Sequence, residues 1–121
     1  MIKLYGIKNC DSVKKAQKWL HEHQFAYQFH DFRRDGLTLA QLDFFTRQLG
    51  WNQLLNRQSS SWRQLDTEQQ THLTEEKALL LMLDTPTIIK RPILETAQSL
   101  LIGFSPERYA AFFNSVQQPL R

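Results

Sequence analysis

Residues 2–20 read IKLYGIKNCDSVKKAQKWL: an apolar segment, a short polar turn and a segment with helical spacing. The apolar residues 2–7 predict a short buried strand, and Gly6 allows the backbone to turn out of it. From Val13 onward, apolar residues recur at helical spacing while lysines occupy positions between them, which is the pattern of an amphipathic helix with one face in a core. The stretch therefore predicts a strand that passes through a tight turn into a helix.

Cys10 is the only cysteine in the chain and stands in this turn, where Asp11 or Ser12 is expected to cap the helix that follows. The amides at the start of a helix have no partner within the helix, and together with the helix dipole they stabilise a thiolate. An ordinary thiol has a pKa of about 8.5, and a helix N-terminus with cations nearby lowers that value. We therefore predict that Cys10 carries the chemistry of this protein.

The next elements complete a strand–helix–strand unit and lead into a helical region. Residues 25–32 alternate between the two sides of a strand, with aromatic side chains on one side. Thr38 can cap a following helix that Gly50 ends, and the polar residues 51–83 read as further helices. These patterns predict a helical insertion over about residues 37–84.

The last part of the chain predicts a hairpin followed by a helix. Residues 93–95 and 100–102 form two short extended segments with a tight connection, and Ser105 and Pro106 open the final helix. The order of elements is that of a thioredoxin-like α/β fold, with a four-stranded mixed sheet and helices inserted between its two halves. A chain of 121 residues, 41% of them hydrophobic, suits a single domain over residues 1–121.

Composition argues against several classes of function. Fifteen Lys and Arg against twelve Asp and Glu give a net charge of +3, but the cations are scattered, which indicates a mild attraction to anions rather than nucleic-acid binding. The longest apolar run, residues 78–83, is too short to cross a membrane. A single cysteine and the absence of a signal-peptide pattern predict a cytoplasmic protein. The cysteine and the four histidines lack zinc-ligand spacing, so we expect no metal, and a monomer is the expected state.

Three motifs resemble those of the arsenate reductase (ArsC) family. They are LYGIKNCDSVKKA at residues 4–16, KRPIL at 90–94 and IGFSPE at 102–107. The similarity runs over nearly the whole chain in the same order and is greatest to the YffB branch, whose relatives include the Spx-type transcription regulators. The resemblance implies an ArsC-like thioredoxin fold and a nucleophilic cysteine at Cys10.

The resemblance also implies an anion-binding site around that cysteine. The arginine that precedes the proline of the family's Arg-Pro-Ile motif is matched by Arg91, and a second family arginine, in the helical region, is matched by Arg57. A guanidinium suits an oxyanion because its parallel donors match two oxygens. We assign the turn residues Asn9, Asp11 and Ser12 to the same site.

Two further positions follow from the resemblance. Pro92 matches the proline that faces the active thiol in thioredoxin-like folds, so we expect a cis peptide bond before it and a backbone open to an extended peptide such as glutathione. The third arginine of well-known arsenate reductases is replaced here by the stretch at residues 104–106, Phe-Ser-Pro. Arg108 lies close by but inside the expected helix, and we do not assign that role to it.

The resemblance implies a glutathione-dependent thiol reductase or arsenate reductase-like oxidoreductase. Because a lone cysteine cannot resolve its own oxidised product, Cys10 needs an outside thiol, which makes glutathione the co-substrate and glutaredoxin a possible partner. The substrate is an oxyanion or a thiol or disulfide compound, and no tightly bound cofactor is expected.

Two alternatives of other classes remain. One is an Spx-like regulator that binds RNA polymerase, although the Cys-x-x-Cys switch common in those proteins is absent because position 13 is Val13. The other is a non-catalytic module that binds glutathione or a protein thiol. An unreactive Cys10 would favour that module over an enzyme.

Overall fold

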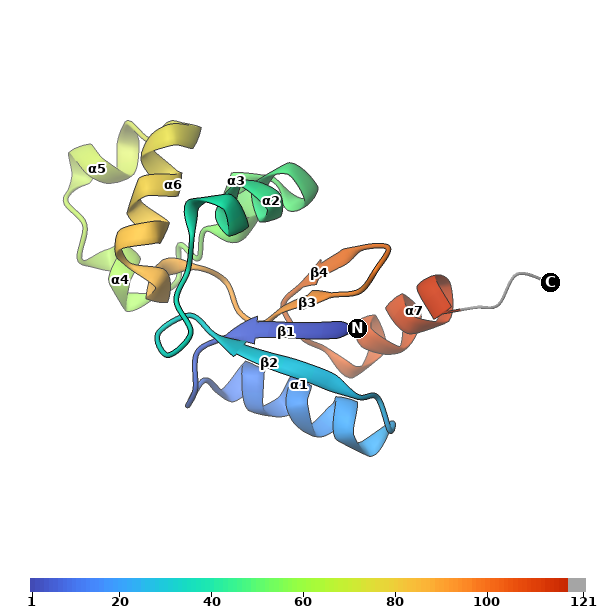
Figure 1. Ribbon diagram of the computed structural model, residues 1–121. Helices are drawn as coiled ribbons and strands as arrows, with labels where there is room; N and C mark the ends of the chain where they lie inside the picture. Colours follow the sequence, from blue (N-terminus) through green and yellow to red (C-terminus); the bar gives the residue numbers. More distant parts are fainter. Residues whose placement is uncertain (118–121) are drawn as a thin grey trace. The chain divides into compact units, whose positions relative to one another are not determined.

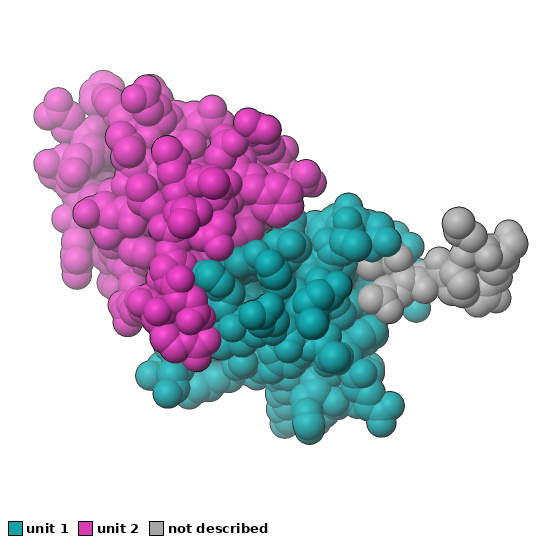
Figure 2. All heavy atoms as spheres, in the orientation of Figure 1, with its two compact units in different colours: residues 1–31, 91–121 teal, residues 32–90 magenta. Residues whose placement is uncertain are grey.

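The computed structural model describes residues 1–117 and divides into two compact units (Figures 1 and 2). The first unit comprises residues 1–31 and the described residues from 91 onward. Its elements are β1 (Ile2–Gly6), α1 (Asp11–Glu22), β2 (Tyr27–Asp31), β3 (Ile93–Glu95), β4 (Leu100–Ile102) and α7 (Pro106–Gln117). The second unit is residues 32–90, which contain the predicted insertion. Its elements are α2 (Leu39–Leu49), α3 (Trp51–Leu54), α4 (Ser60–Arg63), α5 (Thr67–Thr71), α6 (Glu75–Asp84) and the 3-10 turn η1 (Pro86–Ile88).

The first unit is built on a four-stranded mixed sheet with the strand order β2-β1-β3-β4. Strand β1 pairs in parallel with β2 and antiparallel with β3, and β3 and β4 form an antiparallel hairpin. This confirms the predicted fold class, and the hairpin strands have the predicted bounds. The first two strands are one to three residues shorter than predicted, because β1 ends at Gly6 and β2 spans Tyr27–Asp31.

The core of the first unit lies between one face of this sheet and the helices α1 and α7 (Figure 1). Its buried side chains come from alternate strand positions and from one face of each helix: Ile2, Leu4, Val13, Ala16, Trp19, Leu20, Leu94, Tyr109 and Phe113. Burial of each large apolar side chain contributes about 1.5–3 kcal/mol to stability. The predicted apolar stripe of α1 is therefore the face that holds this helix against the sheet.

Gly6 sets how closely α1 can approach the end of β1. A Cβ atom added at Gly6 would stand 2.6 Å from one γ carbon of Val13 and 3.5 Å from the other. The Val13 side chain is buried and, being β-branched, has little freedom to rotate away. Only glycine therefore fits here, and its close packing sets the start of the turn that carries Cys10.

Replacement of Gly6 with alanine is expected to lower the free energy of unfolding by about 1–3 kcal/mol, because the added carbon overlaps a packed core side chain. Urea unfolding measures this difference. The same substitution in a Val13→Ala background, where both γ carbons are gone, should cost much less. An equal cost in the two backgrounds would contradict the packing argument.

Tyr109 places a hydroxyl inside the core of the first unit. Its ring lies 5.4 Å from that of Trp19 and 4.7 Å from that of Phe104, both edge-on. The hydroxyl is buried and has no hydrogen-bond partner in the part of the chain that the structure describes. Burial raises the pKa of Tyr109 well above its usual 10.0, and the charge of Arg108 opposes this shift.

The Tyr109→Phe variant is expected to be more stable than the wild type by about 1 kcal/mol, because it removes a buried hydroxyl without a partner. The difference should grow above pH 10. Above pH 10 the phenol ionises in the unfolded chain while the buried phenol stays protonated, so the stability of the wild type falls as the pH rises and that of the phenylalanine variant does not. Urea unfolding at neutral pH and above pH 10 measures both effects, with the partly exposed Tyr27→Phe as control. Lower stability of Tyr109→Phe at both pH values would show that its hydroxyl is satisfied.

The second unit packs its helices around buried apolar side chains: Leu42, Phe45, Leu54, Leu55, Ala78, Met82, Ile88 and Ile89. The predicted Thr38 cap is confirmed, because its hydroxyl accepts from the Gln41 amide and the Gln41 side chain accepts from the Thr38 amide. Leu55 and Ile89 form an isolated antiparallel bridge. Beside it, the Lys90 amide donates to the Leu54 carbonyl at 2.7 Å, which holds two distant segments of the insertion together.

Among residues 1–117, none of the helices has the length and apolar character needed to span a membrane. The assignment of residues 1–121 to a single domain stays a prediction.

Candidate functional site at one end of the sheet

Several predicted site residues are placed at one end of the sheet by its topology. Gly6 at the end of β1 pairs with Asp31 at the end of the parallel strand β2. The antiparallel strand β3 begins here, with Ile93 opposite Tyr5, and β4 ends here, with Ile102 opposite Ile93. The turn after β1, the residues that precede β3 and the loop that leads to α7 therefore all lie at this end of the first unit.

Cys10 is the N-cap residue of α1, which corrects the expectation that Asp11 or Ser12 would cap it. Cys10 has extended backbone angles, φ −94° and ψ 127°, and its carbonyl accepts from the Lys14 amide at 2.9 Å. Asn9 before it adopts a left-handed φ of 73°, a conformation that asparagine tolerates. The turn is thus completed at Asn9, and Asp11 and Ser12 become the first residues of the helix.

The Cys10 side chain makes no capping hydrogen bond to the amides of the first turn. Cys10 packs against the core and is partly exposed. Helix α1 is 12 residues long, and Cys10 stands at the positive end of its dipole. Asp11 and Ser12 are exposed beside it. This position suits a thiolate that attacks an incoming sulfur or an oxyanion.

Asp31 anchors the turn that carries Cys10, a role that the sequence analysis missed. Asp31 is 4% exposed, and its carboxylate accepts from the Lys8 amide at 3.1 Å. This hydrogen bond ties the turn after β1 to the end of β2. The signal in the sequence was a lone acidic residue at the end of a strand pattern with aromatic side chains at alternate positions.

Arg91 and Pro92 precede β3 at the same end of the sheet. The peptide bond between them is cis, as predicted. Arg91 is partly buried, and its Nε atom is out of contact with solvent. The Pro92 carbonyl accepts from the Gly103 amide at 2.8 Å, which joins this segment to the loop after β4. The pairing of the Arg91 backbone with an extended peptide stays a prediction.

Arg57 belongs to the second unit. Its Nη2 atom donates to the side-chain oxygen of Asn52 at 2.8 Å, and its guanidinium carbon stands 5.3 Å from the ring centroid of Trp62. The exposed guanidinium is therefore held by two neighbours within its own unit. Its role as an anion ligand stays a prediction.

This end of the sheet lies within the segment, residues 5–112, that matches the sequence profile of the ArsC family. The chain belongs to the ArsC family. The family match extends from β1 into α7 and includes the segments around Cys10 and Arg91. It confirms the assignment made from the three motifs.

Solved structures and curated proteins agree with the ArsC assignment. The YffB (PA3664) protein is 46% identical with a TM-score of 0.87, covering 92% of this chain and 97% of that chain. An arsenate reductase (ArsC) related protein from Brucella melitensis is 42% identical with a TM-score of 0.78, covering 93% of each chain. Global transcriptional regulator Spx 2 of Bacillus cereus is 27% identical over 93% of this chain and 86% of its own length. These matches confirm the resemblance to YffB and the relationship to the Spx regulators.

The side chain of Arg108 lies back over the loop that precedes its own helix. Its backbone is in the first turn of α7, where its amide donates to the Ser105 hydroxyl at 3.1 Å. Its Nη1 atom, however, stands 3.1 Å from the point that a Cβ on Gly103 would occupy. Gly103 has a φ of 80° and bonds to Pro92, so the guanidinium lies back over the loop after β4. Helical periodicity alone does not reveal this placement.

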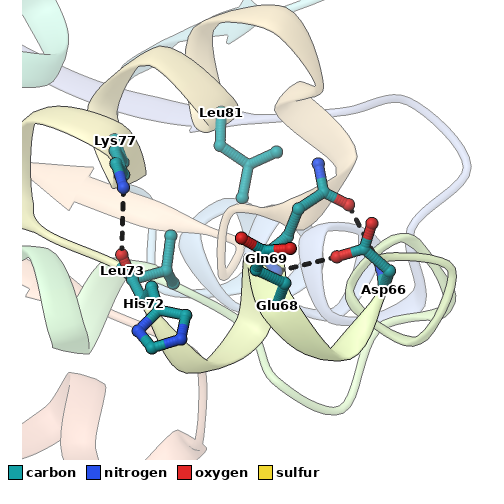
Figure 3. A pocket seen from close by; sticks show the side chains of 7 residues that line it. All are labelled: Asp66, Glu68, Gln69, His72, Leu73, Lys77 and Leu81. Atoms are coloured by element: carbon teal, nitrogen blue, oxygen red, sulfur yellow. Dashed lines mark hydrogen bonds between the residues drawn. The ribbon is translucent and has the colours of Figure 1, made fainter.

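A polar hollow of about 340 Å³ lies outside the ArsC motifs, in the second unit (Figure 3). It is lined by Asp66, Glu68, Gln69, His72, Leu73, Lys77 and Leu81. Asp66 and Gln69 form a reciprocal capping box at the start of α5, and the Lys77 ammonium donates to the His72 carbonyl at 3.5 Å. Residues 1–117 contain no group of three or more His, Cys, Asp and Glu side chains arranged to hold a metal. Local helix capping therefore accounts for several of the polar groups around this hollow.

Proposed function

We propose that this chain is an arsenate reductase-like oxidoreductase that uses Cys10 as its nucleophile and glutathione as its co-substrate. The observation that carries the proposal is the partly exposed thiol at the N-terminus of α1, where it makes no capping hydrogen bond, in a member of the ArsC family. The name of the Brucella melitensis relative, an arsenate reductase related protein, supports the same class of chemistry.

The reaction begins with attack by the Cys10 thiolate. With a mixed disulfide of glutathione, the sulfur of Cys10 bonds to the glutathione sulfur, the old S–S bond breaks, and the other thiol leaves as a thiolate that takes up a proton. A thiol of free glutathione or of glutaredoxin then attacks the adduct and restores Cys10. The released product is oxidised glutathione or glutathionylated glutaredoxin, which joins the outside thiol to the glutathionyl group of the substrate, so the outside thiol is the reductant.

With arsenate, the Cys10 thiolate displaces an oxygen, which leaves as water after protonation, and forms a sulfur–arsenic bond. The glutathione sulfur next bonds to Cys10, the sulfur–arsenic bond breaks, and its electron pair reduces arsenic(V) to arsenic(III). Glutaredoxin then removes the glutathione from Cys10. Both routes pass through the same disulfide between Cys10 and glutathione.

In this proposal, cations and amides hold the anionic substrate while the thiolate attacks. Arg91 stands at the same end of the sheet as the Cys10 turn and supplies a guanidinium, and Arg57 is the second candidate cation. The first-turn amides of α1, including those of Asp11 and Ser12, are the donors nearest in sequence to the thiol. Pro92 contributes backbone contact to glutathione, and Asn9 shapes the turn.

The test is a coupled assay with glutathione, glutaredoxin, glutathione reductase and NADPH, run separately with arsenate and with a glutathione mixed disulfide. We expect NADPH oxidation with at least one substrate and, without glutaredoxin, a protein mass increase of one glutathionyl group. Digestion should locate that group on Cys10. Absence of both turnover and adduct would contradict the enzyme proposal. Glutathione binding without turnover would identify a non-catalytic thiol-binding module.

A second candidate function is an Spx-like regulator, which the match to Spx 2 of Bacillus cereus favours. Such a protein would act by contact with RNA polymerase. The position three residues after Cys10 is Val13, which is buried in the core and cannot take part in a thiol switch. Binding of the purified chain to purified RNA polymerase, equal under reducing and oxidising conditions, would support this function.

A further inference from the structure

An apolar groove is open on the second unit, where the beginnings of α2 and α6 lie together. Two adjoining hollows, of about 290 and 360 Å³, share the side chains of Leu39 and Leu79. The remaining lining residues are Ala40, Asp43, Glu75, Glu76 and Leu80. Leu39 is 51% exposed and Leu80 is 54% exposed, so large apolar surfaces face solvent here.

The exposed leucines are not explained by packing within the second unit. Ala78 and Met82 are the buried residues of helix α6. Leu80 lies between them in sequence and is therefore on another side of the helix. On α2, the buried residues are Leu42, Phe45 and Thr46, whereas Leu39 stands at the exposed start of the helix. Single exposed leucines are common on protein surfaces, but these converge on one groove.

Carboxylates surround this apolar groove. Asp43, Glu75 and Glu76 are among its lining residues, which include no lysine or arginine. Asp43 pairs with the exposed Arg47 at 2.9 Å, which offsets part of the charge. Glu75 and Glu76 lie in the first turn of α6, where the helix dipole favours negative side chains. The groove is therefore acidic at its edge, in a chain whose net charge is +3.

We propose that this groove binds a cationic amphipathic helix of a partner protein. Apolar side chains on one face of the partner helix would cover Leu39, Leu79 and Leu80, while its flanking Lys or Arg residues would face the acidic edge. A second copy of this chain is disfavoured because a two-fold contact through this groove would bring its carboxylates close to those of the other copy. The interaction does not involve Cys10, so it is independent of the proposed reductase activity.

The direct test uses fluorescein-labelled synthetic helices and the full chain, with binding followed by fluorescence anisotropy. One peptide carries leucines at helical spacing flanked by lysines, a second has glutamates in place of the lysines, and a third has the first composition in scrambled order. We expect the cationic amphipathic peptide to bind at least tenfold more tightly than the other two, with affinity that falls as salt increases.

Variants of the groove separate its apolar and charged contributions. Leu80→Ser should weaken binding of the cationic peptide by roughly tenfold, because it removes an apolar anchor, and Glu76→Lys should weaken it by a similar factor. The matched control is Glu68→Lys, which makes the same charge change on α5, outside the groove. Urea unfolding of each variant confirms that the fold is retained.

These measurements distinguish a cationic partner helix from a second copy of this chain as the occupant of the groove. Equal weakening by Glu68→Lys and Glu76→Lys, or unchanged binding in Leu80→Ser, would overturn the proposal by showing attraction to overall charge alone. Equal affinity for the scrambled peptide would also overturn it. Sedimentation that shows a dimer of the free chain, abolished by Leu80→Ser, would assign the groove to a second copy instead.

Discussion

Replacement of Cys10 with serine is expected to reduce glutathione-dependent turnover to the uncatalysed background, a loss on the order of 10³-fold or more. A serine hydroxyl is not ionised near neutral pH, and it forms no disulfide, so neither the attack nor the glutathionyl adduct can occur. Because Cys10 is only partly buried and its side chain makes no capping hydrogen bond, the substitution should leave stability nearly unchanged. The coupled assay, intact mass and urea unfolding measure the three effects.

The control for this variant is Glu22→Ala, which alters an exposed side chain at the other end of α1, outside the candidate site. It should retain most of the turnover and the full glutathionyl adduct. Turnover by Cys10→Ser at the wild-type rate would contradict the thiol mechanism. Loss of turnover together with loss of stability would instead indicate a structural role.

The Arg91→Ala variant is expected to lower kcat/KM for the anionic substrate by about 10- to 100-fold, the size expected for one charge-assisted hydrogen bond. The guanidinium offers two parallel donors to an oxyanion and keeps its charge at every working pH, so alanine removes both. Steady-state kinetics with each substrate measure this effect.

Two further variants test whether substrate binding needs the guanidinium group of Arg91 or only a positive charge near this position. Arg91→Lys should recover only part of kcat/KM, since an ammonium keeps the charge without the two-pronged geometry. Lys90→Ala removes the adjacent exposed cation and should leave kcat/KM close to wild type. Equal effects of Lys90→Ala and Arg91→Ala would contradict a specific role for Arg91.

Short sequence patterns predicted most of the fold because helix caps, turn residues and side-chain periodicity depend on residues that are close together in the chain. Thr38 lies three residues before a glutamine, the arrangement of a capping box, and Gly50 can take a positive φ, so both ends of α2 were readable. The hairpin over residues 93–102 was equally clear from its two short apolar runs and tight connection. The assignment to the ArsC family came from motifs that stand in the same order as in its members.

The candidate site was predicted less completely, because its geometry depends on contacts between distant segments. The sequence favoured Asp11 or Ser12 as the cap of α1, but the left-handed conformation of Asn9 makes Cys10 the N-cap residue. The strand pattern does not reveal that the Asp31 carboxylate accepts from the Lys8 amide. Helical periodicity places Arg108 in α7 but does not reveal that its guanidinium folds back over Gly103.

The amino-acid sequence by itself determined the order of strands and helices, the position of the single thiol at the start of a helix, and the family. These depend on periodicity, capping residues and turn residues within a few positions of one another. The tertiary structure alone decided that only glycine fits at position 6 and that Leu39 and Leu80 share an open groove. The physical reason is that the packing of one element against another, and the exposure of a side chain to solvent, depend on residues far apart in the chain. A local sequence pattern does not specify these contacts.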